Sequence, residues 1–277
     1  MSNTLAYKRM ALKVRILALK AMREQKGGHV GGSMSIADAI AVLYSDKMNI
    51  DPKNPKWEGR DWLVMSKGHC GPALYAALCI RGFIPEAALA TMNTPHTILP
   101  SHCDRLKTPG VDMSTGSLGQ GMSTALGVAM GHKVQGMDNT TYLILGDGEC
   151  DEGQVWEGAL FAAAKKLDNV IAFVDYNKKQ LDGYTKDICD LGDLAKKFED
   201  FGWYAQNIDG HDVDAISAAI DSAKAEKGRP SVIVLNTLKG KGCFFAEDVL
   251  YNHHMSFTKE QADEAIARLE EQLKALD

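Results

Sequence analysis

The sequence predicts an α/β domain with a mostly parallel sheet covered by helices on both faces. Short runs that are apolar throughout, such as residues 141–145 and 170–174, alternate with helical stretches. That alternation is typical of buried parallel strands joined by helices. No linker or internal repeat divides the 277 residues, and a chain of this length can bury one large core. We therefore expect a single domain over residues 1–277.

The first half of the chain is expected to form three helices and one strand. Apolar residues spaced by three and four predict a helix over residues 5–23, which two glycines end. Ser35 is expected to cap a second helix, with Asp38 three residues further on. The remaining elements of this half are a strand over 61–65, a helix over 72–81 and a long loop over 91–112.

From residue 116 onward the alternation becomes regular. His211 lies between an expected strand and an expected helix, where we expect it to act as a cap. The expected strands cover residues 141–145, 170–174, 203–208 and 231–236. The expected helices cover residues 119–133, 154–166, 191–201, 212–226 and 259–276.

Composition argues against several classes of protein. The chain has 31 basic and 36 acidic residues, a net charge of -5, and no polybasic run, which disfavours binding to nucleic acid. Its apolar runs are too short to cross a bilayer, and its first residues show no signal peptide. The 6 cysteines are scattered without a CxxC pair, which argues against a zinc or disulfide framework. We expect a cytoplasmic protein with reduced thiols.

Polar residues follow two neighbouring strands at the point where each strand ends. One strand runs into the tripeptide GDG at residues 146–148, and the next runs into DYN at residues 175–177. Asp147 and Asn177 are 30 positions apart, the length of one strand–helix–strand unit, which would place the strand ends side by side. A carboxylate and an amide oxygen suit Mg²⁺ or Ca²⁺, and a helix beginning near Glu152 would favour phosphate. The sequence therefore predicts a metal–diphosphate site.

A GDG tripeptide alone is weak support, because a strand-to-helix turn without any ligand explains it as well. The second strand end and the glycine-rich STGSLGQG at residues 114–121 favour a ligand. No P-loop pattern is present, and no GxGxxG follows a strand and opens a helix with an acidic partner. Nucleotide and dinucleotide sites of those types are therefore disfavoured.

Histidines give the second indication of function. His96 and His132 are expected to be structural, whereas five others lie in loops beside glycines or at the edge of the site. Imidazoles there would hydrogen-bond a polyhydroxylated or phosphorylated ligand and stabilise a developing oxyanion. Lys67 and Lys239 lie in glycine-containing loops. Each side chain is expected either to contact a phosphate or to be exposed to solvent, and the sequence favours neither alternative. The five histidines are His29, His69, His102, His253 and His254.

The segment GDGECDEGQVWEGALFAAAKKLDNVIAFVDYNKKQLDG, residues 146–183, resembles the thiamine-diphosphate motif of transketolases. The resemblance covers nearly the whole chain, because five further segments match transketolase signatures in the right order. What is resembled is the first domain of the family, which binds the diphosphate. The five segments are GGHVGGSMS from residue 27, MSKGHCGPALYAAL from 65, SHCDRLKTPGV from 101, STGSLGQG from 114 and LKGKG from 238.

The resemblance implies roles for residues that bind thiamine diphosphate and its metal. The metal, Mg²⁺ or Ca²⁺, would be held by the side chains of Asp147 and Asn177 and by the carbonyl of Lys179. Gly148 and His69 would contact the diphosphate. The other expected cofactor contacts are Gly116 at the aminopyrimidine, Leu118, Asp175 and Leu181 around the thiazolium, and Lys239 and His253.

The resemblance also implies residues that meet the substrate or a neighbouring protomer. His29 and His102 match residues that contact the substrate and the developing alkoxide. His253 matches the late active-site histidine, with His254 as the alternative, because the tryptophan and glycine usual around that histidine are here replaced by asparagine and histidine. Glu152 matches a buried glutamate that meets its counterpart across the subunit interface.

The implied activity is transfer of a two-carbon ketol group from a ketose phosphate to an aldose phosphate, with histidines moving protons. In the family, a glutamate that activates the cofactor lies in a second domain, which we expect to be missing from this chain. Full-length transketolases are more than twice as long. We therefore expect the N-terminal subunit of a split enzyme, completed by a chain with the pyrimidine-binding and C-terminal domains in an α₂β₂ complex.

Other interpretations stay open at this point. A half of deoxyxylulose-phosphate synthase, or the α subunit of a 2-oxo-acid dehydrogenase, shares the GDG…N frame, although the GGH, SKGH and STGSLGQG segments favour transketolase. A paralogue that binds the cofactor without catalysing a reaction is disfavoured, because the two predicted metal-binding side chains and the histidines are all present. Sugars of the pentose phosphate pathway are the default substrates, and a specialised catabolic ketose is the alternative.

Overall fold

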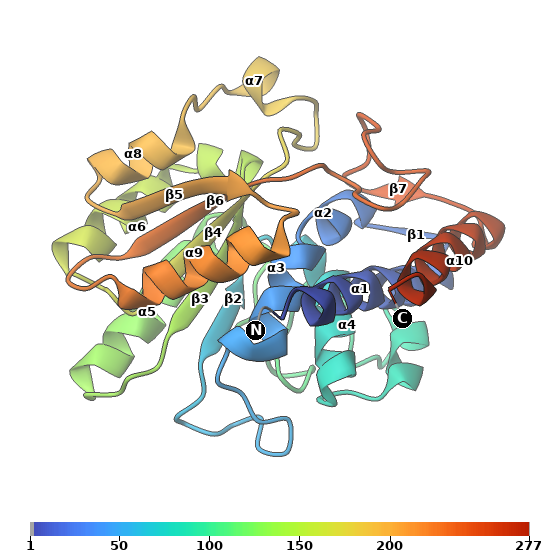
Figure 1. Cartoon of the computed structure of the whole chain (residues 1–277), viewed down its shortest axis with the longest axis horizontal. Coiled ribbons are helices and arrows are strands. Elements are labelled where there is room, and N and C mark those ends of the chain that lie inside the picture. The colour runs from blue at the N-terminus through green and yellow to red at the C-terminus, as the bar shows by residue number, and fades with distance from the viewer. Residues whose placement is uncertain (1–2, 277) are drawn as a thin grey trace.

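The fold is built around a five-stranded sheet with the strand order β2-β3-β4-β6-β5, in which every neighbouring pair is parallel. The computed structural model describes residues 3–276, so residues 1, 2 and 277 of the expected domain lie outside the described part. The expected α/β architecture is confirmed (Figure 1). The strands are β2 (Trp62–Met65), β3 (Thr141–Gly146), β4 (Val170–Tyr176), β5 (Tyr204–Asp209) and β6 (Ser231–Asn236).

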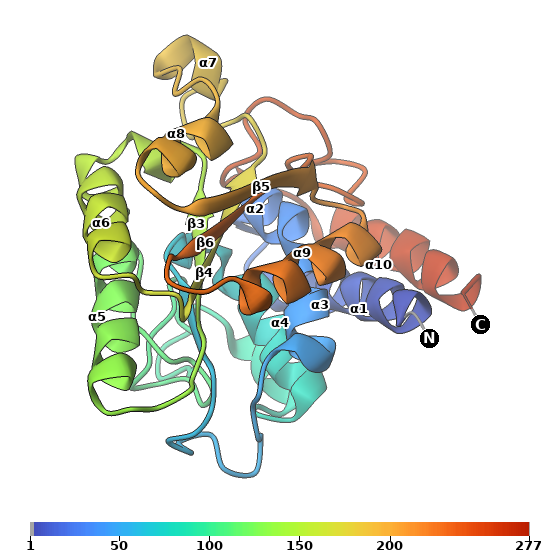
Figure 2. The ribbon, with the colours of Figure 1, turned by 60° about the vertical axis from the view of Figure 1, so that its left-hand side comes forward.

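Helices cover both faces of this sheet, as the uniformly apolar strands predict (Figure 2). Successive strand residues point to opposite faces, so Leu143 and Leu145 of β3 pack in one core cluster and Tyr142 and Ile144 pack in the other. The first cluster lies under α5 (Gln120–Val134), α6 (Gly153–Ala164) and α8 (Leu194–Asp200). The second is covered by α1 (Thr4–Arg23), α3 (Ala37–Val42), α4 (Gly71–Arg81), α9 (Val213–Ala225) and α10 (Lys259–Lys274).

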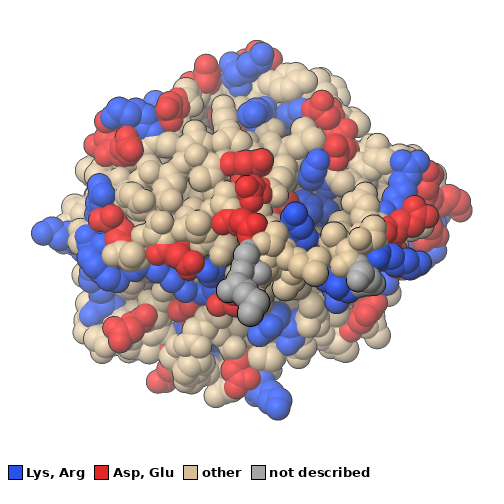
Figure 3. All heavy atoms as spheres, viewed as in Figure 1, with Lys and Arg blue, Asp and Glu red and all other residues tan. Residues whose placement is uncertain are grey.

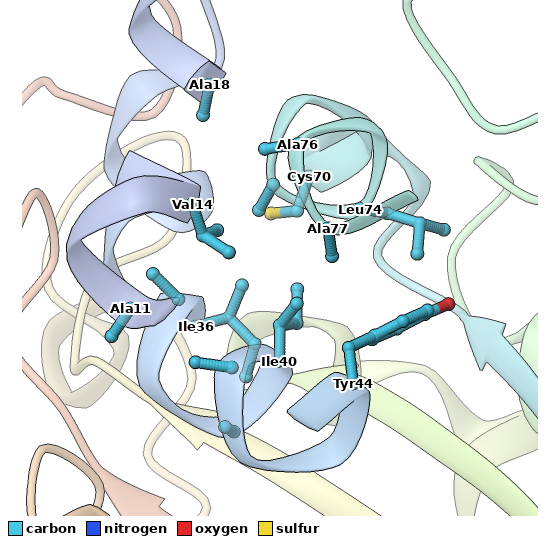
Figure 4. Packing of buried hydrophobic residues seen from close by; sticks show 14 of the residues in the cluster. Ala11, Val14, Ala18, Ile36, Ile40, Tyr44, Cys70, Leu74, Ala76 and Ala77 are labelled. Atoms are coloured by element: carbon cyan, nitrogen blue, oxygen red, sulfur yellow. The ribbon is translucent and has the colours of Figure 1, made fainter. Parts of the chain in front are cut away.

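The larger core cluster joins α1, α3 and α4 through small and branched side chains. Figure 4 shows Val14 of α1, Ile36 at the start of α3 and Ile40 of α3 directed toward Ala77 of α4. Ala76 and Ala77 let α4 lie close to its neighbours, and all five side chains are buried. This packing holds α1, α3 and α4 in place relative to one another. These helices support the segments from the first half of the chain that contribute to the site.

The second helix of the chain begins earlier than expected and is interrupted. It consists of α2 (Val30–Ser35) and α3, followed by a π-helical turn over Leu43–Lys47. The prediction that Ser35 caps this helix is wrong. A capping serine would accept a hydrogen bond from a backbone N–H of the helix. The hydroxyl of Ser35 is instead buried inside the fold and donates a hydrogen bond of 2.6 Å to the charged carboxylate of Asp175.

The second half differs from the prediction at the caps and at short elements. α9 is capped by Asp212, whose carboxylate accepts from two backbone N–H groups, so the expected capping role of His211 is wrong. His211 instead bridges Asp38, at 2.7 Å from its Nδ1, and the backbone N–H of Leu238, which donates to its Nε2. The two-residue strands β1 (Gly27–Gly28) and β7 (Met255–Ser256) and the short helix α7 (Thr185–Ile188) are among the short elements that were not expected.

Charges on the molecular surface are mixed in sign. On the face shown in Figure 3, basic and acidic side chains are interspersed around the molecule. Among residues 3–276, no helix has the length and apolar character needed to cross a membrane. All 6 cysteines are free thiols.

Candidate active site

A pocket of about 290 Å³ lies at the carboxyl ends of β3 and β4. The strand register pairs Gly146 with Asp175, so the GDG and DYN segments lie side by side as the sequence predicted. A larger cavity of about 700 Å³ surrounds Trp62, where β2 begins, and contains none of the predicted site residues. The smaller pocket is lined by Gly32, Lys67, His69, Leu118, Gly146, Asp147, Gly148, Glu149, Asp151, Glu152, Asn177, Lys179, Gln180, Leu181, Lys239 and His253.

The three predicted metal ligands are brought together in this pocket. Asp147, Asn177 and Lys179 are all buried. The carboxylate of Asp147 accepts from the backbone N–H groups of Gly148, at 2.9 Å, and of Lys178. Burial, and then the charge of Asp175, raise the pKa of Asp147 to about 7. A divalent cation would offset this buried negative charge, and the carboxylate, amide and carbonyl oxygens are the ligands that Mg²⁺ or Ca²⁺ prefers. The residues present therefore fit such an ion.

The resemblance implied that Asp175 lies in the wall of the pocket around the thiazolium. The structure instead places it in the interior, beneath the residues that line the pocket. It is fully buried and does not line the pocket. Although burial disfavours its charged form, an ion pair with Lys67 lowers the pKa of Asp175. Four side chains donate to its carboxylate: Ser35, Lys67, Asn177 and Thr237.

Lys67 and Lys239 both point inward. The ammonium group of Lys67 is buried against Asp175 and the carbonyl oxygen of Gly32, so it is neither solvated nor free for a phosphate. Lys239 donates to the carbonyl of Lys179 at 2.7 Å and lies 3.4 Å from Nδ1 of His253. Burial lowers the pKa of Lys239 to about 8. Of these two lysines, only Lys67 forms an ion pair within the described residues, so the charge of Lys239 has no carboxylate partner there.

Glu149 is a buried residue of the site that the sequence analysis did not identify. Its carboxylate accepts from the Ser66 hydroxyl after β2, from the N–H of Gly119 before α5 and from the N–H of Gly146 at the end of β3. One side chain thus joins three segments around the pocket. A glutamate next to GDG carries no periodic signal, because its partners come from distant parts of the chain.

Five histidine rings gather beside the pocket, as the sequence predicted. The ring of His29 lies 5.2 Å from His69, 5.6 Å from His102, 5.5 Å from His253 and 4.7 Å from His254, measured between centroids. The rings of His69 and His253 are 4.5 Å apart. Among residues 3–276, no group of three His, Cys, Asp or Glu side chains is arranged to hold a metal ion.

Four rings of this cluster have lowered pKa values, which favours their neutral form. Burial, followed by His254 and His102, lowers the pKa of His29 to about 4. Burial and then Lys239 lower the pKa of His253 to about 3. Burial also lowers the pKa values of His69 and His102. Neutral imidazoles can donate one hydrogen bond and accept another, which suits contact with hydroxyl groups and proton transfer.

Glycines and leucines complete the rim. Gly116 has a φ of +139°, and a Cβ there would lie 2.8 Å from Cδ2 of His102, so a side chain would displace that ring. A Cβ at Gly148 would lie 2.7 Å from Cβ of Gln180. Leu118 and Leu181 line the pocket with exposed fractions of 37% and 60%, which leaves an apolar edge open to a ligand or another chain.

Comparison with known proteins agrees with this geometry. Residues 6–273 match the family described as transketolase, thiamine diphosphate binding domain. The chain belongs to the transketolase family. Its fold is that of the thiamine-diphosphate-binding domain, and the match to the transketolase model over residues 6–273 favours this family over the related enzyme classes that share the GDG…N frame.

Two relatives and one solved structure show how much of a transketolase is matched. The 6-deoxy-6-sulfo-D-fructose transketolase subunit of Clostridium sp. (strain MSTE9) is 52% identical, with 94% of each chain covered. An apulose-4-phosphate transketolase subunit from Actinobacillus succinogenes is 37% identical, with 98% of this chain and 97% of the relative covered. The transketolase structure from Campylobacter jejuni superimposes with a TM-score of 0.90 at 30% identity, over 99% of this chain. This chain spans only 43% of that structure.

Proposed function

We propose that this chain is the N-terminal subunit of a heteromeric transketolase, which transfers a two-carbon ketol group from a ketose to an aldose. Residues 1–277 would form one domain that binds thiamine diphosphate and a divalent metal. The observation that carries the proposal is the pocket itself, in which oxygen donors for a metal lie beside a cluster of neutral histidines. Relatives matched over nearly their whole length are named as transketolase subunits, which supports it.

The chain's own residues would bind and orient the cofactor. When bound, thiamine diphosphate supplies the carbanion-stabilising group that ketol transfer requires. Asp147, Asn177 and the carbonyl of Lys179 would hold Mg²⁺ or Ca²⁺. The diphosphate would contact His69, Lys239 and the backbone N–H of Gly148, with Gly116 at the aminopyrimidine and Leu118 and Leu181 at the thiazolium.

The histidines would handle protons at the substrate. His29 and His102 would hydrogen-bond the hydroxyl and carbonyl oxygens of the ketose, and His253 would act between cofactor and substrate. Their low pKa values support contact with the substrate, because a ring that is neutral near pH 7 can donate one hydrogen bond and accept another. A ring that was already protonated would lack the acceptor.

A partner chain with the pyrimidine-binding and C-terminal domains would complete the site, most simply in an α₂β₂ complex. The exposed Leu118 and Leu181 support this, because they form an apolar rim that a second protein surface would cover. Glu152 is exposed at the start of α6 on the same rim, where it would meet the neighbouring subunit.

The proposed donor is a ketose with an anionic terminal group. Sugar phosphates of the pentose phosphate pathway are one possibility. The 52% identical relative is named for 6-deoxy-6-sulfo-D-fructose, so a terminal sulfonate is a second possibility, and apulose 4-phosphate is a third. All three are 2-ketoses, and the histidine cluster would bind the end of the sugar that carries the ketone. They differ at the other end of the molecule.

A donor screen with the reconstituted complex tests the proposal. The chain and its candidate partner would be mixed with thiamine diphosphate, Mg²⁺ and glyceraldehyde 3-phosphate. Fructose 6-phosphate, 6-deoxy-6-sulfo-D-fructose, apulose 4-phosphate and pyruvate would be compared as donors. We expect ketol transfer from at least one ketose, and loss of that activity with Asp147→Ala. Activity on pyruvate alone would overturn the proposal.

A further inference from the structure

The small sheet formed by β1 and β7, with two residues in each strand, places His254 opposite His29. Its antiparallel register pairs Gly27 with Ser256 and Gly28 with Met255. The next position in the same register pairs His29 with His254, and their rings meet edge to face at 4.7 Å with an angle of 81° between the planes. The pairing of the two strands next to these residues thus brings the backbone of His29 and the backbone of His254 close together.

The chain on the other side of the two histidines is also anchored. Asn252 is fully buried, and its Nδ2 donates to the carbonyl oxygens of Lys239, at 3.1 Å, and Ala246, at 2.7 Å. Its own carbonyl accepts from the N–H of Gly31 at 2.9 Å. His253 and His254 thus lie between a buried asparagine and a strand, which hold the chain on either side of them.

The two adjacent histidines serve different sides of the cluster. His253 lines the pocket and contacts His69, on the side of the predicted diphosphate contacts. His254 does not line that pocket, is exposed, and contacts His29 on the outer side. Its ring forms no hydrogen bond or ion pair with the rest of the described chain, so its nitrogens are available to a ligand.

We propose that His254 is a specificity-determining residue that binds the ketose substrate and does not bind the cofactor. Its imidazole would hydrogen-bond an oxygen of the sugar beyond the ketol group, either a hydroxyl or the terminal phosphate or sulfonate. The proposal rests on the proposed function. Its position supports the proposal, because the ring is exposed on the outer side of the cluster and lies outside the pocket assigned to the cofactor.

Steady-state kinetics of the reconstituted complex provide the test. With fructose 6-phosphate and 6-deoxy-6-sulfo-D-fructose as donors, we expect His254→Gly to raise KM by about ten-fold and to leave kcat within about two-fold. The Kd of thiamine diphosphate, measured by calorimetry, should not change. His254→Asn keeps a hydrogen-bond donor and should recover part of the loss.

His96→Asn is the matched control. His96 is an exposed histidine outside the cluster, with a φ of +63° that asparagine tolerates well. Its replacement should leave both KM and kcat unchanged. A weaker cofactor Kd in His254→Gly, or an unchanged KM for both donors, would overturn the inference while the proposed function stood.

If the reconstituted complex transfers no ketol group, chemical labelling can still test whether His254 binds the sugar. That result would overturn the proposed function but not, by itself, the role of His254. Diethyl pyrocarbonate modification of His254, followed by mass spectrometry, should be slowed by fructose 6-phosphate or 6-deoxy-6-sulfo-D-fructose and not by thiamine diphosphate alone. Equal modification with and without the sugars would overturn the inference independently of activity.

Discussion

The side-chain amide of Asn177 donates a hydrogen bond of 3.0 Å to Oδ2 of Asp175. This contact turns the amide nitrogen toward the buried carboxylate and leaves the amide oxygen as the atom available to a metal. Asp175 stays charged because Lys67 is paired with it in the interior. A buried ion pair therefore determines which atom of Asn177 the predicted metal site receives.

Removing the charge of Asp175 should damage both stability and metal binding. Asp175→Asn leaves Lys67 buried without a counter-charge, and we expect the free energy of unfolding to fall by about 3–5 kcal/mol in urea titrations. The Mg²⁺ concentration needed for half-maximal thiamine-diphosphate binding should rise by about ten-fold or more. The double variant Lys67→Met, Asp175→Leu should recover only part of the stability, because Ser35, Asn177 and Thr237 still lose their acceptor, and it should not recover Mg²⁺ affinity. A single variant as stable as wild type would contradict this account.

The metal assignment predicts that cofactor binding depends on Asp147 and Asn177. Asp147→Ala and Asn177→Ala should each abolish the Mg²⁺-dependent binding of thiamine diphosphate in calorimetry, because each removes an oxygen ligand. Asp182→Ala is the control, since Asp182 is exposed in the same loop and outside the pocket. Unchanged binding in the first two variants would rule out the assigned site.

Glu149 should be required for the shape of the pocket. Glu149→Ala leaves the hydroxyl of Ser66 and the N–H groups of Gly119 and Gly146 without their acceptor. We expect the free energy of unfolding to fall by at least about 2 kcal/mol in denaturant titrations. Glu152→Ala, at an exposed position, should change it by less than about 0.5 kcal/mol. Equal effects of the two substitutions would show that Glu149 has no such role.

The depressed pKa of His29 predicts that acid destabilises the protein. The folded-state pKa of about 4 lies below the ordinary value of 6.5, so the unfolded state binds more protons between these values. Stability from this group is therefore complete above about pH 6.5 and is lost as pH falls toward about pH 4. His69, His102, His253, His254 and Lys239 face the same ring or lie beside it and shape this dependence.

The measurement is the Tm of wild type and His29→Asn from about pH 7.5 to about pH 5. Wild type should lose more Tm over this range, because the variant lacks the group that must stay neutral. Asp147, whose raised pKa acts in the opposite direction, is present in both proteins and cancels in the comparison. Parallel pH profiles would contradict the expected role of His29.

Local patterns in the sequence were sufficient for the main sheet and the floor of the site. The runs 141–145 and 170–174 are apolar throughout, so both strands and the polar tripeptides after them could be predicted. The two-residue strands β1 and β7 could not, because two residues carry no periodicity. The fixed position of His254 opposite His29 depends on those strands and was missed with them.

Contacts between distant residues were the other part that the sequence could not supply. Serine is a residue type that commonly caps helices, but the hydroxyl of Ser35 donates to Asp175, which is 140 positions away in the sequence. His211 also stands where caps occur, yet it binds Asp38 and the N–H of Leu238. In both cases a tertiary partner replaced the local one, and only the fold shows which partner is present.

The most direct test of the central claim is the rate of ketol transfer by this chain alone, by its candidate partner alone and by their mixture. We expect negligible rates for either chain alone, and a rate in the mixture that requires thiamine diphosphate and Mg²⁺ and saturates at equal amounts of the two chains. Ketol transfer at the full rate by this chain alone would contradict the account.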